Sequence, residues 1–206
     1  MRLLGTGVSP ANKQIWKMNI RFTLLLLLFS GSAYCQTKQA GKVSATLLVE
    51  DLYSTHNDHF TGVSFRINRT VTKNFSIGAG LQHSHTPVHR DNGWNLYRLQ
   101  FFPLFVSQTY SLRADKKTYP FLHAEEGISF NRYSKEYQNN PGPLSYIKEK
   151  GIYAYFGGGL SSNVNGKFNL TAEAGFKGFH FSANQLDVNP HGVTGKLGVE
   201  WNFQKK

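Results

Sequence analysis

A strict alternation of apolar and polar residues runs through the end of the chain, residues 196–203. Leu197, Val199, Trp201 and Phe203 alternate there with Lys196, Gly198, Glu200 and Asn202. A period of two is typical of a β-strand whose faces meet different surroundings. Several earlier segments share this pattern, with polar residues and glycine on the second face. The alternation therefore indicates strands that close into a barrel in a membrane, with one face toward lipid and the other toward a polar lumen.

Eight candidate strands with turn residues between them can be read along the chain. They are residues 42–50, 60–69, 74–85, 94–112, 119–133, 151–162, 167–181 and 192–203. Most exceed the roughly 9–11 residues that a tilted strand needs to cross a bilayer. Short connections at 70–73, 113–118 and 163–166 alternate with longer ones at 51–59, 86–93, 134–150 and 182–191. The sequence thus predicts an all-β fold, an eight-stranded antiparallel transmembrane β-barrel with its longer loops outside, and ten strands remain an alternative.

An export signal precedes these strands. Arg21 is followed by the apolar run 22–29 and by small residues up to Cys35. This order of features is typical of a secretory signal peptide whose own start is Met18, with residues 1–17 as an upstream extension. We expect residues 1–35 to be removed and residues 36–206 to form a barrel domain in the outer membrane of a Gram-negative cell. A lipoprotein cysteine at Cys35 is the second interpretation.

Removal of that segment also takes away the single cysteine of the chain. Disulfides, thiol catalysis and cysteine metal sites are then excluded, and we expect no cofactor. The formal charge of +11 loses four basic residues with the signal and becomes +7. The remaining basic residues are scattered without an arginine-rich run, which argues against nucleic acid as a partner. Outer-membrane lipid and lipopolysaccharide are the expected counter-charge.

The polar faces of the candidate strands carry charges of both signs. The predicted lumen network consists of Arg66, Arg98, Glu125, Glu173, Lys177, Lys196 and Glu200. An eight-stranded barrel is only wide enough to hold side chains, so these charges must pair with one another. A filled lumen argues against an open pore, although a small-solute porin stays an alternative. Glu126 falls on the lipid face unless a bulge moves it into the lumen, and Pro103 removes a hydrogen-bond donor from its strand.

Aromatic residues mark the expected membrane interfaces. The predicted interface aromatics are Trp94, Tyr97, Phe130, Trp201 and Phe203, and Phe179 is expected near the outer interface as well. The terminal aromatic residue of the last strand is also the feature that barrel-assembly machinery recognises, so that machinery is an expected partner.

Two fragments carry a family resemblance. Tyr97-Arg-Leu-Gln-Phe-Phe-Pro-Leu-Phe105 and Tyr119-Pro-Phe-Leu-His-Ala-Glu-Glu-Gly127, with the glycine-rich amphipathic strands around them, resemble the small outer-membrane β-barrel proteins of Bacteroidetes, of porin-like or OmpA-like barrel type. The resemblance implies an outer-membrane location and a barrel fold, and it implies no reaction. A structural or surface-interaction role, without enzymatic activity, is the expected function.

A second, weaker resemblance concerns His180-Phe-Ser182-Ala-Asn184. It is similar to the His-x-Ser-Asn motif of outer-membrane lipid A 3-O-deacylases, in which a histidine and a serine form a base–nucleophile pair. Ala183 replaces the asparagine of that motif, and the last strand offers no suitably placed glutamate. An acyl-ester hydrolase using His180 and Ser182 is therefore the enzymatic alternative.

Histidines gather toward the predicted extracellular end. His56 and His59 lie in the first loop, and His83 and His85 share one strand face. Neutral imidazoles bind zinc and copper, so these four residues form an alternative metal site, although their spacing matches no known metal motif. The predicted loop 134–150 is aromatic and polar and could bind a surface ligand, whose identity the sequence leaves unknown.

Overall fold

Eight long antiparallel strands account for almost all of the structure. The computed structural model describes residues 41–91, 93–181 and 190–203. The strands are β1 (Val43–Ser54), β2 (His59–Thr70), β3 (Phe75–Asp91), β4 (Trp94–Ser111), β5 (Thr118–Tyr137), β6 (Ser145–Asn163), β7 (Phe168–Phe181) and β8 (His191–Phe203). Among the described residues no helix is long and apolar enough to cross a bilayer.

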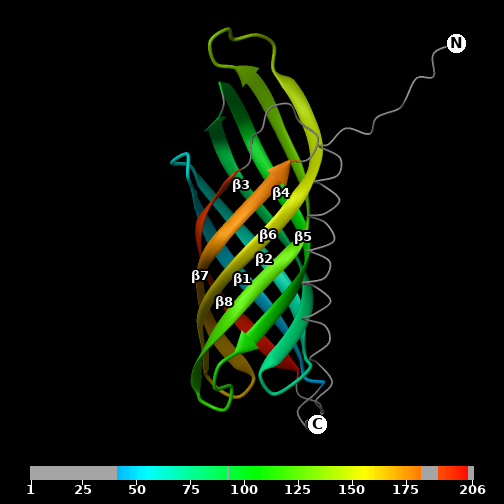
Figure 1. Cartoon of the computed structure of the whole chain (residues 1–206), viewed down its shortest axis with the longest axis vertical. Helices are drawn as coiled ribbons and strands as arrows, with labels where there is room; N and C mark the ends of the chain where they lie inside the picture. The colour runs from blue at the N-terminus through cyan, green and yellow to red at the C-terminus, as the bar shows by residue number, and fades with distance from the viewer. Residues whose placement is uncertain (1–40, 92, 182–189, 204–206) are drawn as a thin grey trace, which may run out of the picture. The chain divides into compact units, whose positions relative to one another are not determined.

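The eight strands close into a single barrel, as Figure 1 shows. Each strand pairs with the next in sequence order, and β8 returns to pair with β1 from Val43↔Phe203 to Ser54↔Gly192. Closure leaves no unpaired strand edge, which is the condition for a sheet to exist in lipid. The predicted eight-stranded antiparallel barrel is confirmed.

The two ends of the barrel differ. At the turn end lie the connections 71–74, 112–117 and 164–167, together with the start of β1 and the end of β8. At the opposite loop end, the predicted bounds of three long connections are wrong, because the strands continue into them. β3 runs to Asp91 and β4 begins at Trp94, so a short connection in which Gly93 has a φ of 79° replaces the predicted loop 86–93. The predicted loop 51–59 likewise shortens to residues 55–58, and the predicted loop 134–150 shortens to residues 138–144.

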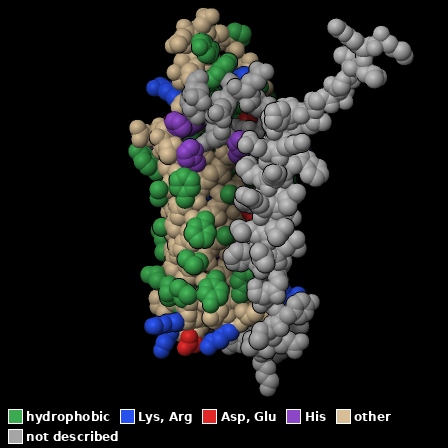
Figure 2. Space-filling view, viewed as in Figure 1, with side chains coloured by type: hydrophobic (Ala, Val, Ile, Leu, Met, Phe, Trp, Pro, Cys, Tyr) green, Lys and Arg blue, Asp and Glu red, His purple; other side chains and the backbone are tan. Residues whose placement is uncertain are grey.

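Apolar side chains cover the outer wall between the two ends. Figure 2 shows them over the middle of the visible face, with charged side chains at one end and histidines toward the other. Exposed large residues occur on all eight strands; examples are Leu47, Ile67, Leu81, Leu104, Ile128, Phe156, Leu170 and Leu197. Glu126 stays in register between Val106 and Ala154 and is half-buried on this outer wall, without the bulge that would move it into the lumen.

A β-bulge in β4 reverses the facing of that strand. The β4–β5 register shifts by one residue between Tyr97 and Gln100, and Arg98 adopts a positive φ of 52°. Leu96 is buried on one side of the bulge, and Leu99 and Phe101 are buried on the other. Arg98 is therefore exposed, and its predicted place in the lumen network is wrong. One extra residue in a strand has this consequence because the side-chain period is two.

Candidate functional site

The centre of the lumen is crossed by buried ion pairs. Arg66 on β2 donates from Nη2 to Glu173 Oε1 on β7 at 2.6 Å. Lys196 on β8 donates from Nζ to both carboxylate oxygens of Glu125 on β5, each at 2.9 Å. Both pairs link strands that lie across the barrel from each other, and all four side chains are nearly inaccessible.

A third pair lies nearby. Lys177 Nζ on β7 is 2.6 Å from Glu50 Oε1 on β1 and donates to Gln82 Oε1 on β3 at 3.3 Å. The Tyr153 hydroxyl on β6 donates to Gln82 and to Glu125. It therefore connects the Lys177–Glu50 pair to the Lys196–Glu125 pair. His123 contacts Glu125 Oε1 at 3.0 Å and Arg66 Nη1 at 2.8 Å through its Nε2 atom.

The network balances its formal charge. Apart from histidine and tyrosine, the buried ionisable side chains of the described residues are Arg66, Lys177 and Lys196 against Glu50, Glu125 and Glu173. Three cations facing three carboxylates leave the lumen neutral, which removes most of the cost of burying unpaired charge.

Five predicted network residues thus come together, namely Arg66, Glu125, Glu173, Lys177 and Lys196. Glu200 lies closer to the turn end, where it accepts hydrogen bonds from Ser44 Oγ (2.6 Å) and Asn169 Nδ2 (2.9 Å). Sequence reasoning missed Glu50. Glu50 lies four residues after Thr46 and therefore faces the lumen with it. The three consecutive apolar residues 47–49 interrupt the apolar–polar alternation from which this facing could have been predicted.

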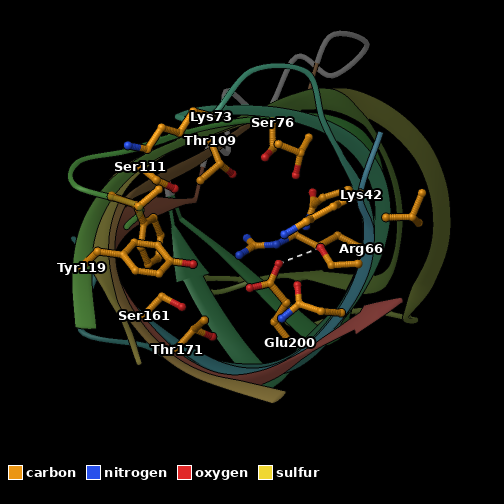
Figure 3. A pocket seen from close by; sticks show the side chains of 17 residues that line it. Lys42, Arg66, Lys73, Ser76, Thr109, Ser111, Tyr119, Ser161, Thr171 and Glu200 are labelled. Carbon is orange, nitrogen blue, oxygen red and sulfur yellow. Dashed lines mark hydrogen bonds between the residues drawn. The ribbon is translucent and has the colours of Figure 1, made fainter. Parts of the chain in front are cut away.

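A polar vestibule of about 190 Å³ occupies the turn end of the lumen, as Figure 3 shows. Lys42 and Lys73 stand among its lining residues, and Arg66 and Glu200 also line it. The remaining labelled residues are mostly hydroxyl-bearing: Ser76, Thr109, Ser111, Tyr119, Ser161 and Thr171. The vestibule meets the buried ion-pair layer, whose side chains fill the lumen beyond it.

An apolar cluster fills the loop-end half of the lumen. Its members are Leu52, Phe60, Leu96, Leu99, Phe101, Phe105, Tyr133, Tyr153, Tyr155 and Phe179. Phe101 and Phe179 stack with ring centroids 4.1 Å apart, so Phe179 lies inside the barrel and the predicted interface position is wrong. The lumen is therefore polar over part of its length only, and an apolar plug closes the rest.

The four histidines of the alternative metal site lie in separate places. His56 lies at the loop end near His89 and His191, with ring centroids 5.5 and 6.5 Å apart. His59 contacts Asp51 at 2.8 Å. His83 and His85 stack on the outer wall instead, 6.0 Å apart. Among the described residues no group of three or more histidine, cysteine or acidic side chains could hold a metal ion.

Of the predicted hydrolase pair, the structure describes His180 and not Ser182. His180 is exposed on the outer wall and pairs in register with Ile152, while Ser182 lies outside the described residues. The signal segment 1–35 lies outside them as well.

The predicted interface aromatics lie near both ends of the wall. Phe130, Trp201 and Phe203 are exposed. Trp94 packs against the apolar cluster and against Tyr137, and the Tyr97 hydroxyl donates to Glu136 at 2.9 Å.

Neither a scan of protein-family models nor a search of curated proteins finds a match to this sequence. Solved structures do match. The attachment invasion locus protein Ail of Yersinia pestis aligns with a TM-score of 0.50 at 10% identity, over 81% of this chain and 100% of that one. A major outer membrane protein from Thermus thermophilus aligns with a TM-score of 0.51 at 6% identity, over 78% of this chain and 99% of that one.

At these identities the likeness concerns the fold. The closed sheet, the apolar outer wall and the filled lumen define this chain as a small eight-stranded transmembrane β-barrel.

Proposed function

We propose that this protein is a closed, non-conducting barrel of the bacterial outer membrane that acts through its extracellular surface, in a structural or surface-interaction role and without an enzymatic reaction. The export signal, with cleavage after Cys35, delivers it there, and the resemblance to Bacteroidetes barrels supports that group as its source. The turn end, which carries both ends of the barrel, faces the periplasm, and the loop end faces outward. Barrel-assembly machinery is the partner during insertion.

The filled lumen is the observation that carries this proposal. The neutral ion-pair layer and the apolar plug lie in series along one barrel, and their side chains are almost entirely inaccessible. A permeating solute would have to separate paired charges and displace packed aromatic rings. Both are expensive, because buried charges lose their partners and the packed side chains leave little room for relaxation.

The outward hairpins supply the surface. β5 and β6 extend beyond the β1–β2 hairpin, as Figure 1 shows, and Tyr137, Leu144 and Tyr146 are exposed near their tip. Exposed aromatic and apolar side chains on a projecting hairpin are typical of a binding surface.

Conductance of the purified protein in planar bilayers tests the closed lumen. We expect no steady ohmic steps under conditions in which a known porin, measured in the same bilayer, gives them. Steady steps from this protein would overturn the proposal and favour the small-solute porin.

A further inference from the structure

A group of cations interleaved with aromatic rings lies on the outer wall of β3–β6, on the loop-end side of the exposed apolar residues. We define this outer-wall patch as His85, Phe102, Phe130, Arg132, Lys148 and Lys150. Register makes it continuous: His85 pairs with Gln100, Gln100 with Arg132, and Arg132 with Lys148. These side chains are distinct from the lumen network and from Tyr137, Leu144 and Tyr146 at the hairpin tip.

The apolar residues on the turn-end side of the patch indicate where the patch lies relative to the membrane. The row beneath consists of Leu81, Leu104, Ile128 and Ile152, which pair across the same four strands and are exposed. On β5 the stretch 120–130 matches the roughly 9–11 residues that cross a bilayer, and Arg132 is the next residue on the outer face after Phe130. Arg132 and Lys148 therefore stand where acyl chains give way to headgroups.

Aromatic rings fix the positions of the cations. The Arg132 guanidinium lies over Phe102, 5.5 Å from the ring centroid, and the Lys150 ammonium lies over Phe130 at the same distance. The Lys148 ammonium lies 5.6 Å from the Tyr146 ring. For Arg132 and Lys148, the cation–π contacts hold the charge in place and add no counter-charge.

Around Arg132 and Lys148, the described residues supply little counter-charge. Arg132 and Lys148 are directly opposite each other on neighbouring strands, an arrangement of like charges that destabilises a sheet by itself. Neither forms an ion pair within the described residues. Glu136, four residues along the same face of β5, accepts a hydrogen bond from Tyr97.

We infer that the outer-wall patch binds the phosphate groups of a phosphorylated glycolipid in the outer leaflet, the chemistry of the lipid A anchor of lipopolysaccharide. This inference rests on the proposed outer-membrane location. Strands lie about 4.8 Å apart, so one phosphate reaches Arg132 and Lys148 together. Arginine bonds phosphate oxygens through a planar fork, and lysine adds a point charge. The acyl chains of the same molecule lie against the apolar row below.

Native mass spectrometry of the purified full chain tests this inference. The probes are lipid A with both phosphates and the same lipid A after removal of its phosphates. We expect the unmodified protein to retain the phosphorylated form about tenfold more tightly. Equal retention of the two probes would overturn the inference.

A matched pair of variants locates the site. Arg132→Glu with Lys148→Glu is expected to lower retention of phosphorylated lipid A about tenfold. Lys116→Glu with Lys117→Glu makes the same change of charge on an exposed turn at the opposite end and is expected to retain the lipid as the unmodified protein does. An equal loss in both variants would show attraction by net charge alone and would overturn the site.

The two proposals fail separately. Heat-modifiable migration on gels shows whether each variant has folded, and the comparison of the two probes on the unmodified protein needs no variant. Steady conductance would contradict the closed lumen and leave lipid binding intact. Loss of phosphate selectivity would contradict the patch and leave the closed lumen intact.

Discussion

Glu125 connects more of the lumen than any other single residue of the network described above. Its carboxylate accepts from Lys196, contacts His123, and receives the Tyr153 hydroxyl. These partners come from β5, β6 and β8, and Arg66 Nη1 on β2 lies 3.6 Å from Glu125 Oε1, so one carboxylate links four strands. Removing its charge leaves cationic partners buried without compensation, which costs far more than the loss of an exposed ion pair.

Glu125→Gln is expected to destabilise the barrel by on the order of 3 kcal/mol, because the Lys196 ammonium then lacks its anion in a buried site. The shift of the urea midpoint for the folded gel band, in a fixed detergent, measures the effect. Glu126→Gln is the matched control, since Glu126 is the next residue and lies on the outer wall. A midpoint shift as large for Glu126→Gln would contradict the role of the lumen network.

Residue facing could be predicted from the sequence where alternation was clean and not elsewhere. Arg66, Glu173 and Lys177 sit in strands with one polar and one apolar face, and the structure brings them together. In β4, apolar residues occupy both faces, as in Phe101-Phe102, so the sequence pattern does not show which side chains face the lumen. For the same reason, the bulge that exposes Arg98 could not be recognised from the sequence. Cross-lumen partners were beyond prediction as well, because pairing depends on side-chain reach.

At the scale of elements, β4 departs furthest from a regular strand. Pro103 is buried toward the lumen, and the β3–β4 ladder has no assigned pairs between Leu81↔Leu104 and Ser84↔Phe101. A proline has no backbone N–H to donate, so this interruption is the expected result of its presence. The neighbouring bulge gives β4 the extra residue that carries Leu99 and Phe101 into the plug.

The last strand supplies the second prediction. Phe203→Ser is expected to lower the amount of heat-modifiable barrel in the outer-membrane fraction several-fold, because under the proposed function the terminal aromatic of β8 is the feature that assembly machinery reads. Phe65→Ser is the matched control, since Phe65 is also exposed on the outer wall (38% against 43% for Phe203) but lies within β2. Equal losses in the two variants would indicate a general need for apolar wall residues.

Strand number and order followed from the sequence, whereas strand ends did not. The eight candidates match β1–β8 because each carries its own alternation between turn residues. The loop-end limits were misplaced because histidine, proline and charged residues in 86–91 indicate a loop, although the hairpin ladder extends through them to Asp91. Backbone pairing with a long neighbour overrides such local preferences.

At the scale of the whole molecule, the proposals place function on two surfaces of the described barrel, the outward hairpins and the outer wall. An enzymatic role would require His180 and Ser182 to act on a lipid ester. Their arrangement stays a prediction, and lipid A composition tests it directly.

Ser182→Ala is expected to leave lipid A unchanged, because a non-enzymatic barrel removes no acyl chain. Mass spectrometry of lipid A compares cells with the gene, without it, and with the variant. The loss of an acyl chain that requires both the gene and Ser182 would establish an outer-membrane hydrolase.

The cross-lumen pairs constrain how such a barrel can enter a membrane. Glu125 and Lys196 belong to β5 and β8, which share no ladder, and Arg66 and Glu173 belong to β2 and β7. A hairpin inserted alone would expose its half of each pair to hydrocarbon, at a cost that only the missing partner removes. The sheet therefore gains most from these contacts at the moment its first and last strands meet, which makes insertion cooperative and partly inserted intermediates short-lived.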